Sequence, residues 1–89
     1  MLESTIEKKV TKYAESLGWW SSKFTSPSNR GVPDHLYIKD GVTVFIEYKQ
    51  LGKQLRTLQE FRIRQMRDHG ATVHVVDSIN AGKAVFDAY

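Results

Sequence analysis

Hydrophobic positions near the start of the chain recur with the spacing of a helix. They are Leu2, Ile6, Val10, Tyr13 and Leu17. Apolar side chains three or four positions apart share one face of a helix, and a glycine such as Gly18 commonly follows the last helical residue. The pattern therefore predicts an amphipathic helix over residues 4–17.

Three short apolar segments bounded by turn residues follow this helix. They span residues 19–24, 35–39 and 42–49, and their aromatic and β-branched content predicts strands. The dipeptide Asp40-Gly41 separates the last two segments and favours a two-residue hairpin turn, because both positions can take positive φ. Each hairpin strand is apolar on both faces, which predicts a central place in the sheet.

The second half of the chain predicts a helix, a strand and a final helix. Residues 55–69 are rich in helix formers and end at Gly70. Residues 72–77 are mostly β-branched, and Ser78 can cap the last helix. The order αβββαβα is typical of an α/β fold with a mixed central sheet flanked by helices. The length predicts one domain, residues 1–89.

The composition narrows the possible classes of protein. The chain has no cysteine, which excludes disulfides, thiolate zinc sites and a cysteine nucleophile. No apolar run approaches the roughly 20 residues that cross a bilayer, and the first residues do not resemble a signal peptide. We therefore expect a cytoplasmic protein with no membrane contact. A formal charge of +3 favours nucleic acid as a partner if the basic residues gather on one surface.

The hairpin turn also determines which polar side chains meet. If Asp40 and Gly41 occupy the turn, counting outward along both strands places Asp34 opposite Glu47. Side chains two residues apart on a strand share a face, so Lys49 points to the same side as Glu47. Opposed side chains in an antiparallel pair have Cβ atoms about 4.5 to 5.5 Å apart, and like charges at that separation destabilise the fold.

A divalent cation would resolve this repulsion. Two carboxylates at that separation supply the oxygen ligands that Mg²⁺ prefers, with coordination sites left for water and phosphate. Lys49 could then orient or deprotonate an attacking water and offset developing charge. Metal-assisted phosphodiester hydrolysis uses all three residues. The alternative is that Asp34 and Lys49 form structural pairs at the ends of the hairpin while Glu47 is solvated.

With these residues the chain resembles the PD-(D/E)xK nuclease superfamily and, within it, the VRR-NUC domains, the virus-type replication and repair nucleases. The matching residues are Gly31-Val32-Pro33-Asp34, Glu47-Tyr48-Lys49 and, ten residues after that lysine, Gln59. The resemblance covers essentially the whole chain. It implies a restriction-endonuclease-like αβββαβ core with a mixed central sheet, followed here by a short C-terminal helix.

The resemblance also implies a role for each residue of the motifs. Asp34 and Glu47 would bind Mg²⁺ or Mn²⁺ together with the main-chain carbonyl of Tyr48. Lys49 would act on the water, and Gln59 would support the site or contact the substrate. No small-molecule cofactor is expected.

Glu7 matches the acidic residue of the family's first helix, which approaches the metal or a water bound to it. A second interpretation stays open, because Ser4-Thr5-Ile6-Glu7 is also a capping box, in which Glu7 bonds back to the amide of Ser4. Glu3, one turn earlier, could take the metal role instead.

Basic residues are spaced to line one face of the second predicted helix. They are Lys53, Arg56, Arg64 and Arg67. Such a stripe contacts DNA phosphates beside a nuclease site, or is only the solvated face of the helix. Lys23 and Arg30 lie shortly before Asp34, where they could approach a phosphate held at the metal. His35 and His74 are expected to be core or surface residues rather than ligands.

Together these features predict a metal-dependent endonuclease that acts on DNA. The resemblance to single-domain phage and bacterial members implies a homodimer that acts on branched DNA such as Holliday junctions. The competing hypothesis is a non-catalytic nucleic-acid-binding module on a nuclease fold. Such modules tend to lose a metal ligand or the lysine, and this chain has both. The enzyme is therefore the favoured interpretation.

Overall fold

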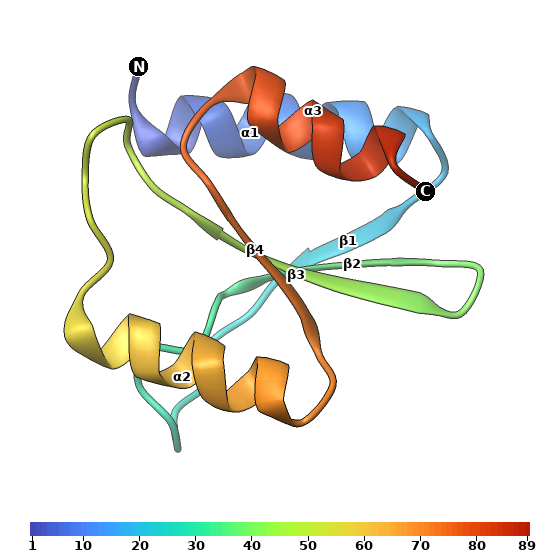
Figure 1. The fold of residues 1–89 in the computed structure, drawn as a ribbon. Helices are drawn as coiled ribbons and strands as arrows, with labels where there is room; N and C mark the ends of the chain where they lie inside the picture. Colours follow the sequence, from blue (N-terminus) through green and yellow to red (C-terminus); the bar gives the residue numbers. More distant parts are fainter.

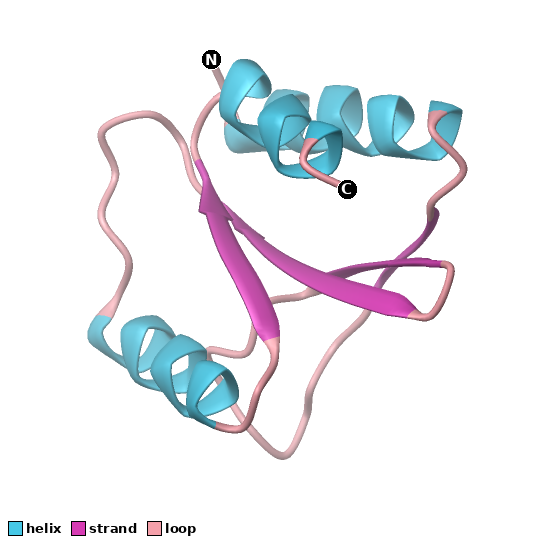
Figure 2. Cartoon of the chain, turned by 45° about the vertical axis from the view of Figure 1, so that its right-hand side comes forward, coloured by secondary structure: helices cyan, strands magenta, loops and turns pink.

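A four-stranded sheet with helices on both faces forms the molecule (Figure 1). The computed structural model describes all 89 residues. In chain order the elements are α1 (Glu3–Ser16), β1 (Trp20–Lys23), β2 (His35–Lys39), β3 (Val42–Tyr48), α2 (Thr57–Asp68), β4 (Thr72–Val76) and α3 (Ile79–Asp87). Helices α1 and α3 cover one face of the sheet and α2 lies against the other (Figure 2). None of the helices has the length and apolar character needed to span a membrane.

The strands are arranged in the order β1-β2-β3-β4. The pairs β1–β2 and β2–β3 are antiparallel and the pair β3–β4 is parallel, so the sheet is mixed and the hairpin is central, as predicted. Asp40 and Gly41 have φ values of 49° and 79°, as the expected hairpin turn requires. Lys39 consequently pairs with Val42.

The main core lies between the sheet and the layer formed by α1 and α3. Its side chains on the hairpin strands are Tyr37, Val44, Ile46 and Tyr48. Ile6, Val10 and Ala14 of α1 and Phe86 of α3 cover them, and burial of this apolar surface is the main favourable term in folding. A Cβ atom on Gly82 of α3 would lie 2.4 Å from Val10 Cγ2. Glycine therefore allows the two helices to approach this closely.

Buried hydroxyl groups also tie α1 to the sheet. The hydroxyl oxygen atoms of Tyr37 and Tyr48 are 2.6 Å apart, and Thr11 Oγ1 lies 2.7 Å from the Tyr37 hydroxyl. Polar groups taken out of water are costly unless they are hydrogen-bonded, and these three satisfy one another. Thr11 thus holds α1 over the central hairpin.

The starts of the first two helices exclude one interpretation of Glu7 and shift one predicted boundary by two residues. Helix α1 begins at Glu3 after Leu2, and no side chain caps it, so the capping box between Ser4 and Glu7 does not form. Helix α2 begins at Thr57 instead of residue 55. Lys53, which was expected on the basic face of this helix, lies in the loop before it.

Candidate active site

The two predicted carboxylates flank the last pairs of the central hairpin. His35 is paired with Ile46, so Asp34 and Glu47 lie one residue beyond that pair on neighbouring strands. Burial, and after it the charge of Asp34, raises the pKa of Glu47 from 4.5 to about 7. The two carboxylates are thus close enough to repel each other.

Glu47 is buried without a partner. The residue is only 8% exposed, its carboxylate is neither hydrogen-bonded nor ion-paired to another side chain, and its oxygen atoms keep some contact with solvent. An ionised group in this position costs free energy unless another charge compensates it. The nearest positive influence is Lys49, whose charge lowers the pKa of Glu47 without forming an ion pair. The arrangement leaves a carboxylate available to a cation.

Lys49 follows directly after the end of β3. Its backbone N–H donates to the carbonyl oxygen of Val76, 2.8 Å away, which extends the pairing of β3 with β4 by one residue. The residue is half-buried, and its side chain makes no hydrogen bond or ion pair with another residue. Its ammonium group is therefore free to act near Glu47.

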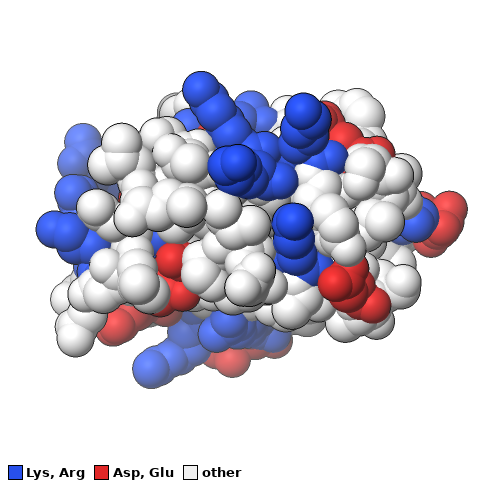
Figure 3. Space-filling view, turned by 90° about the horizontal axis from the view of Figure 1, so that it is seen from above, with Lys and Arg blue, Asp and Glu red and all other residues white.

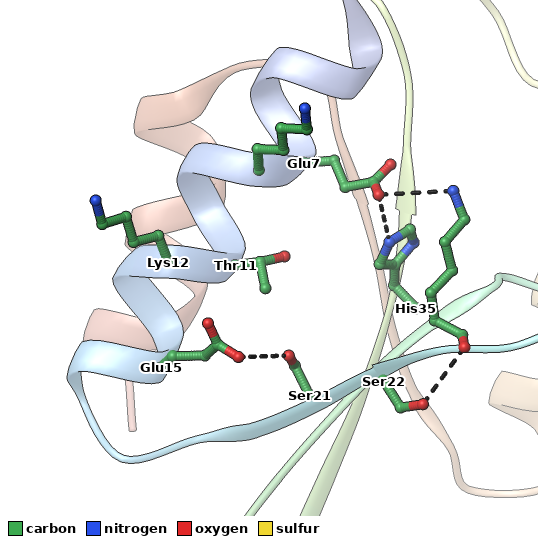
Figure 4. Close-up of a pocket in the computed structure, with 9 residues that line it drawn as sticks. Glu7, Thr11, Lys12, Glu15, Ser21, Ser22 and His35 are labelled. Carbon is green, nitrogen blue, oxygen red and sulfur yellow. Dashed lines mark hydrogen bonds and ion pairs between the residues drawn. The ribbon is translucent and has the colours of Figure 1, made fainter.

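His35 connects the strand end to α1, a contact that the sequence analysis did not anticipate (Figure 4). This histidine is buried, with Nδ1 2.9 Å from Asp34 Oδ1 and Nε2 2.9 Å from Glu7 Oε1. It is a satisfied core residue, as expected, but its partners are the candidate metal ligands. One sign of this contact was present in the sequence, because His35 directly follows Asp34 and lies on the strand face that points to the core.

The charges around His35 shift several pKa values. Burial alone would lower the pKa of His35, but the hydrogen bond to Asp34 and the charge of Glu7 leave it raised. The same hydrogen bond is the largest cause of the lowered pKa of Asp34. Both shifts favour an ionised Asp34, the form that binds cations.

Glu7 faces the site instead of the start of its own helix. Besides His35, its Oε1 lies 3.6 Å from Lys23 Nζ. The charge of Glu3 raises the pKa of Glu47, so the first turn of α1 approaches the other carboxylate. Glu7 thus contacts the site through His35, whereas Glu3 acts on Glu47 only through its charge.

The loop before Asp34 packs against the first turn of α2. Gly31 has a φ of 84°, and a Cβ atom there would lie 2.9 Å from the backbone oxygen of Leu58. Only glycine permits both this conformation and this close approach. The adjacent Gln59 accepts a hydrogen bond from the backbone N–H of Arg56, 2.9 Å away. Gln59 thus caps α2 where the loop meets the helix.

The predicted basic residues fall into two groups. Arg67 donates from Nη2 and Nε to the carbonyl oxygen of Val73, at 2.6 and 3.2 Å, and so joins α2 to β4. Arg62, beside the predicted stripe, donates to the carbonyl oxygen of Arg30, 2.9 Å away. The exposed side chains without such contacts are Arg30, Lys53, Arg56 and Arg64.

The donor set fits a hard divalent cation. No three or more His, Asp or Glu side chains already converge in a metal-binding cluster. Two carboxylates and one main-chain carbonyl, completed by water and phosphate oxygen, are nevertheless the incomplete shell that Mg²⁺ commonly takes at phosphate sites. The unpartnered carboxylate of Glu47 beside Asp34 is the observation that supports this fit.

Known proteins share this fold and about a third or less of the sequence. No family model matches the chain. Over 77 residues it is 34% identical to a protein described as "Putative nuclease p44" from Acyrthosiphon pisum secondary endosymbiont phage 1, spanning 85% of this chain and 83% of that protein. A solved structure described as "VRR_NUC domain" superposes with a TM-score of 0.88 at 27% identity, covering 98% of this chain and 96% of that one. The predicted restriction-endonuclease-like fold is confirmed, and the chain belongs to the VRR-NUC family of nucleases.

Proposed function

We propose that this nuclease is a divalent-metal-dependent endonuclease that hydrolyses DNA phosphodiester bonds at Asp34, Glu47 and Lys49. The observation that carries the proposal is the buried, unpartnered carboxylate of Glu47, held beside Asp34 at the end of the hairpin. Repulsion between two carboxylates is a cost to the fold that a bound cation removes.

Asp34 and Glu47, with the main-chain carbonyl of Tyr48, would hold Mg²⁺ or Mn²⁺. The ion would polarise the scissile phosphate and lower the pKa of a bound water. The Lys49 ammonium would orient that water and offset the charge that develops on phosphate oxygen. Gln59 would support the site from the start of α2.

Glu7 is assigned to the site through its contacts. Its carboxylate binds both His35 and Lys23, and His35 in turn binds Asp34. Glu7 would thus hold the side chain that orients a metal ligand. Hydrogen bonds of this kind, one step removed from the ion, set the orientation of the groups that bind it.

The surface beside the site suits DNA phosphates. Lys23 is exposed and its charge lowers the pKa of Asp34, so its ammonium lies near the proposed cleavage point. Arg30, Lys53, Arg56 and Arg64 would extend this surface. We leave Arg67 out, because its guanidinium is engaged by the carbonyl oxygen of Val73.

Two further features of the proposal are a homodimer and branched DNA as the substrate. Trp20 of β1 is 60% exposed and lies opposite Ile38 of β2, which is 37% exposed. These apolar side chains lie on the sheet face that carries α2, and an exposed apolar pair suits self-association. A two-fold dimer would present two sites to two strands, the symmetry of a four-way junction.

A cleavage panel tests the proposal. Purified protein is incubated with linear, flapped and four-way DNA in Mg²⁺, in Mn²⁺ and in EDTA, and its oligomeric state is measured by light scattering. We expect cleavage only with metal, fastest on a branched substrate, by a dimer. Cleavage in EDTA would contradict the metal requirement. Metal-independent binding with no cleavage would instead favour the non-catalytic module.

The role of His35 can be tested with two substitutions that each keep one contact. Asparagine places a donor near the position of Nδ1, toward Asp34, and glutamine places one near Nε2, toward Glu7. If His35 orients Asp34, His35→Gln should weaken Mn²⁺ binding by about tenfold or more, whereas His35→Asn should stay closer to wild type. Calorimetry measures the affinity, and melting temperatures show whether both variants lose similar stability. Wild-type Mn²⁺ affinity in both variants would rule out this role.

A further inference from the structure

A polar groove runs between α1 and the edge strand β1 (Figure 4). Its volume is about 540 Å³ and none of its lining residues is apolar. They are Glu7, Lys8, Thr11, Lys12, Glu15, Ser21, Ser22, Lys23 and His35. One end of the groove is formed by Glu7, His35 and Lys23, so it opens directly beside Asp34.

The charges along this groove are net positive, because Lys8, Lys12 and Lys23 face the carboxylates of Glu7 and Glu15. Glu7 is engaged by His35 and Lys23, and Glu15 accepts a hydrogen bond from Ser21 Oγ, 3.1 Å away. Lys8 and Lys12 make neither an ion pair nor a side-chain hydrogen bond. In Figure 4 the ammonium group of Lys12 is directed outward at the rim of the groove. Seen from above, Lys and Arg side chains are spread over the face that α1 and α3 form, with Asp and Glu side chains among them (Figure 3).

The dimensions of the groove suit a short length of one strand. Its volume of about 540 Å³ is that of a small-molecule site. A groove of this size can hold a short piece of one sugar–phosphate backbone. From Glu7 to Glu15, α1 advances about 12 Å at its rise per residue, a length that spans a short run of nucleotides. On the opposite wall the Ser21 hydroxyl donates to Glu15, so the donors that are free to contact phosphate oxygen are the lysine ammonium groups.

We propose that the groove between α1 and β1 binds the sugar–phosphate backbone of a single DNA strand next to the bond that is cut. Lys8 and Lys12 contact its phosphates from the wall that α1 forms. This inference rests on the proposed function and specifies its substrate. The preferred DNA carries a single-stranded segment beside the cleavage point.

The test compares neighbouring lysines on the same helix. Lys8→Glu and Lys12→Glu change lysines of the groove, whereas Lys9→Glu makes the same charge change at a residue that does not line it. Binding is measured by fluorescence anisotropy in Ca²⁺, with a duplex that carries a single-stranded tail and with a blunt duplex of equal length. Melting temperatures confirm that the exposed substitutions leave the fold intact.

We expect the two groove variants to weaken binding of the tailed DNA by about tenfold and to reduce its salt slope by about 1 each. The affinity of Lys9→Glu for tailed DNA should stay within about twofold of wild type. The three variants should differ little in their affinity for the blunt duplex. In cleavage assays KM should rise in the groove variants while kcat is kept. If Lys8→Glu and Lys9→Glu lose equal affinity for tailed DNA, the groove is not the binding site. If the groove variants lose as much affinity for blunt duplex as for tailed DNA, the groove does not bind a single strand.

The same measurements separate this inference from the function on which it rests. A wild-type protein that neither takes up Mn²⁺ nor cuts DNA, but binds tailed DNA through Lys8 and Lys12, would refute the nuclease mechanism and retain the groove. A wild-type protein that cuts in Mg²⁺, with groove variants as active and as tightly bound as Lys9→Glu, would retain the mechanism and refute the groove.

Discussion

Replacing Lys49 with methionine should reduce DNA cleavage by about 10² to 10³-fold, while the protein still folds and still binds Mn²⁺. Methionine keeps much of the length of the side chain and removes its charge. The Lys49 side chain makes no hydrogen bond or ion pair within the fold, so stability should change little. Single-turnover cleavage and Mn²⁺ calorimetry at one pH measure the two quantities side by side.

The matched comparison is Asp34→Asn, which removes a proposed metal ligand instead of the group proposed to orient the water. We expect this variant to lose both cleavage and Mn²⁺ binding. Asparagine can still accept the hydrogen bond from His35 Nδ1, so the contact with the strand end is kept. If Lys49→Met cuts DNA at the wild-type rate, or if Asp34→Asn binds Mn²⁺ normally, the proposed division of roles is wrong.

In EDTA, the stability of the protein should fall as the pH rises from about 5 to 8, and Glu47→Gln should remove most of that fall. The pKa of Glu47 is raised to about 7 from 4.5, so the folded state binds this proton more tightly than the unfolded state. The resulting stabilisation is complete below the unfolded pKa and disappears as the pH passes the folded one. Its size is about 2 to 3 kcal/mol.

His35 adds to the same trend, because its pKa is also raised in the folded state and its contribution is lost at the upper end of the range. Glu47→Gln should therefore keep a smaller residual slope. Asp34 has a lowered pKa, so its contribution is lost only in more acidic solution, below its usual value of 3.8. The exposed Glu60→Gln serves as the control and should leave the slope unchanged.

Thermal unfolding at several pH values measures the effect, and for a chain of this length the expected change in Tm is about 10 °C or more. Adding Mg²⁺ or Mn²⁺ should raise Tm more at pH 8 than at pH 5.5, since the cation and the proton compete for the same carboxylate. A Tm that rises between pH 5 and 8 in EDTA, or a cation effect independent of pH, would contradict a buried and unpartnered Glu47.

The hairpin and its consequences could be read from the sequence because they depend on local rules. Asp40 and Gly41 adopt the positive φ values that their turn needs, and the two-residue period of a strand then carries the register out to Asp34 and Glu47. Ser78 caps α3 as predicted, its hydroxyl oxygen accepting from the Ala81 amide, 3.1 Å away. Each of these features involves residues near in the chain or linked by a fixed period.

The contacts of α1 were decided only by the tertiary structure. Ser4 and Glu7 have the spacing of a capping box, but the packing of α1 on the hairpin brings Glu7 to His35, 28 positions later in the chain. A charge-assisted hydrogen bond to a buried imidazole outweighs a bond to an exposed helix amide, because water does not compete for it. No local pattern reports which of the two contacts forms.

Tertiary packing also decided the contact of Arg67 and the pKa of Glu47. Arg67 has the spacing of a surface residue, yet its guanidinium is used by the Val73 carbonyl, because the turn after α2 brings β4 back beside it. The raised pKa of Glu47 depends on how much water the assembled layers exclude, a quantity that no single segment contains. The sequence by itself determined the helices and strands, the register of the hairpin and which acidic and basic residues stand at the strand ends. Packing between distant segments decided which charges are paired, which are buried and which remain free to bind.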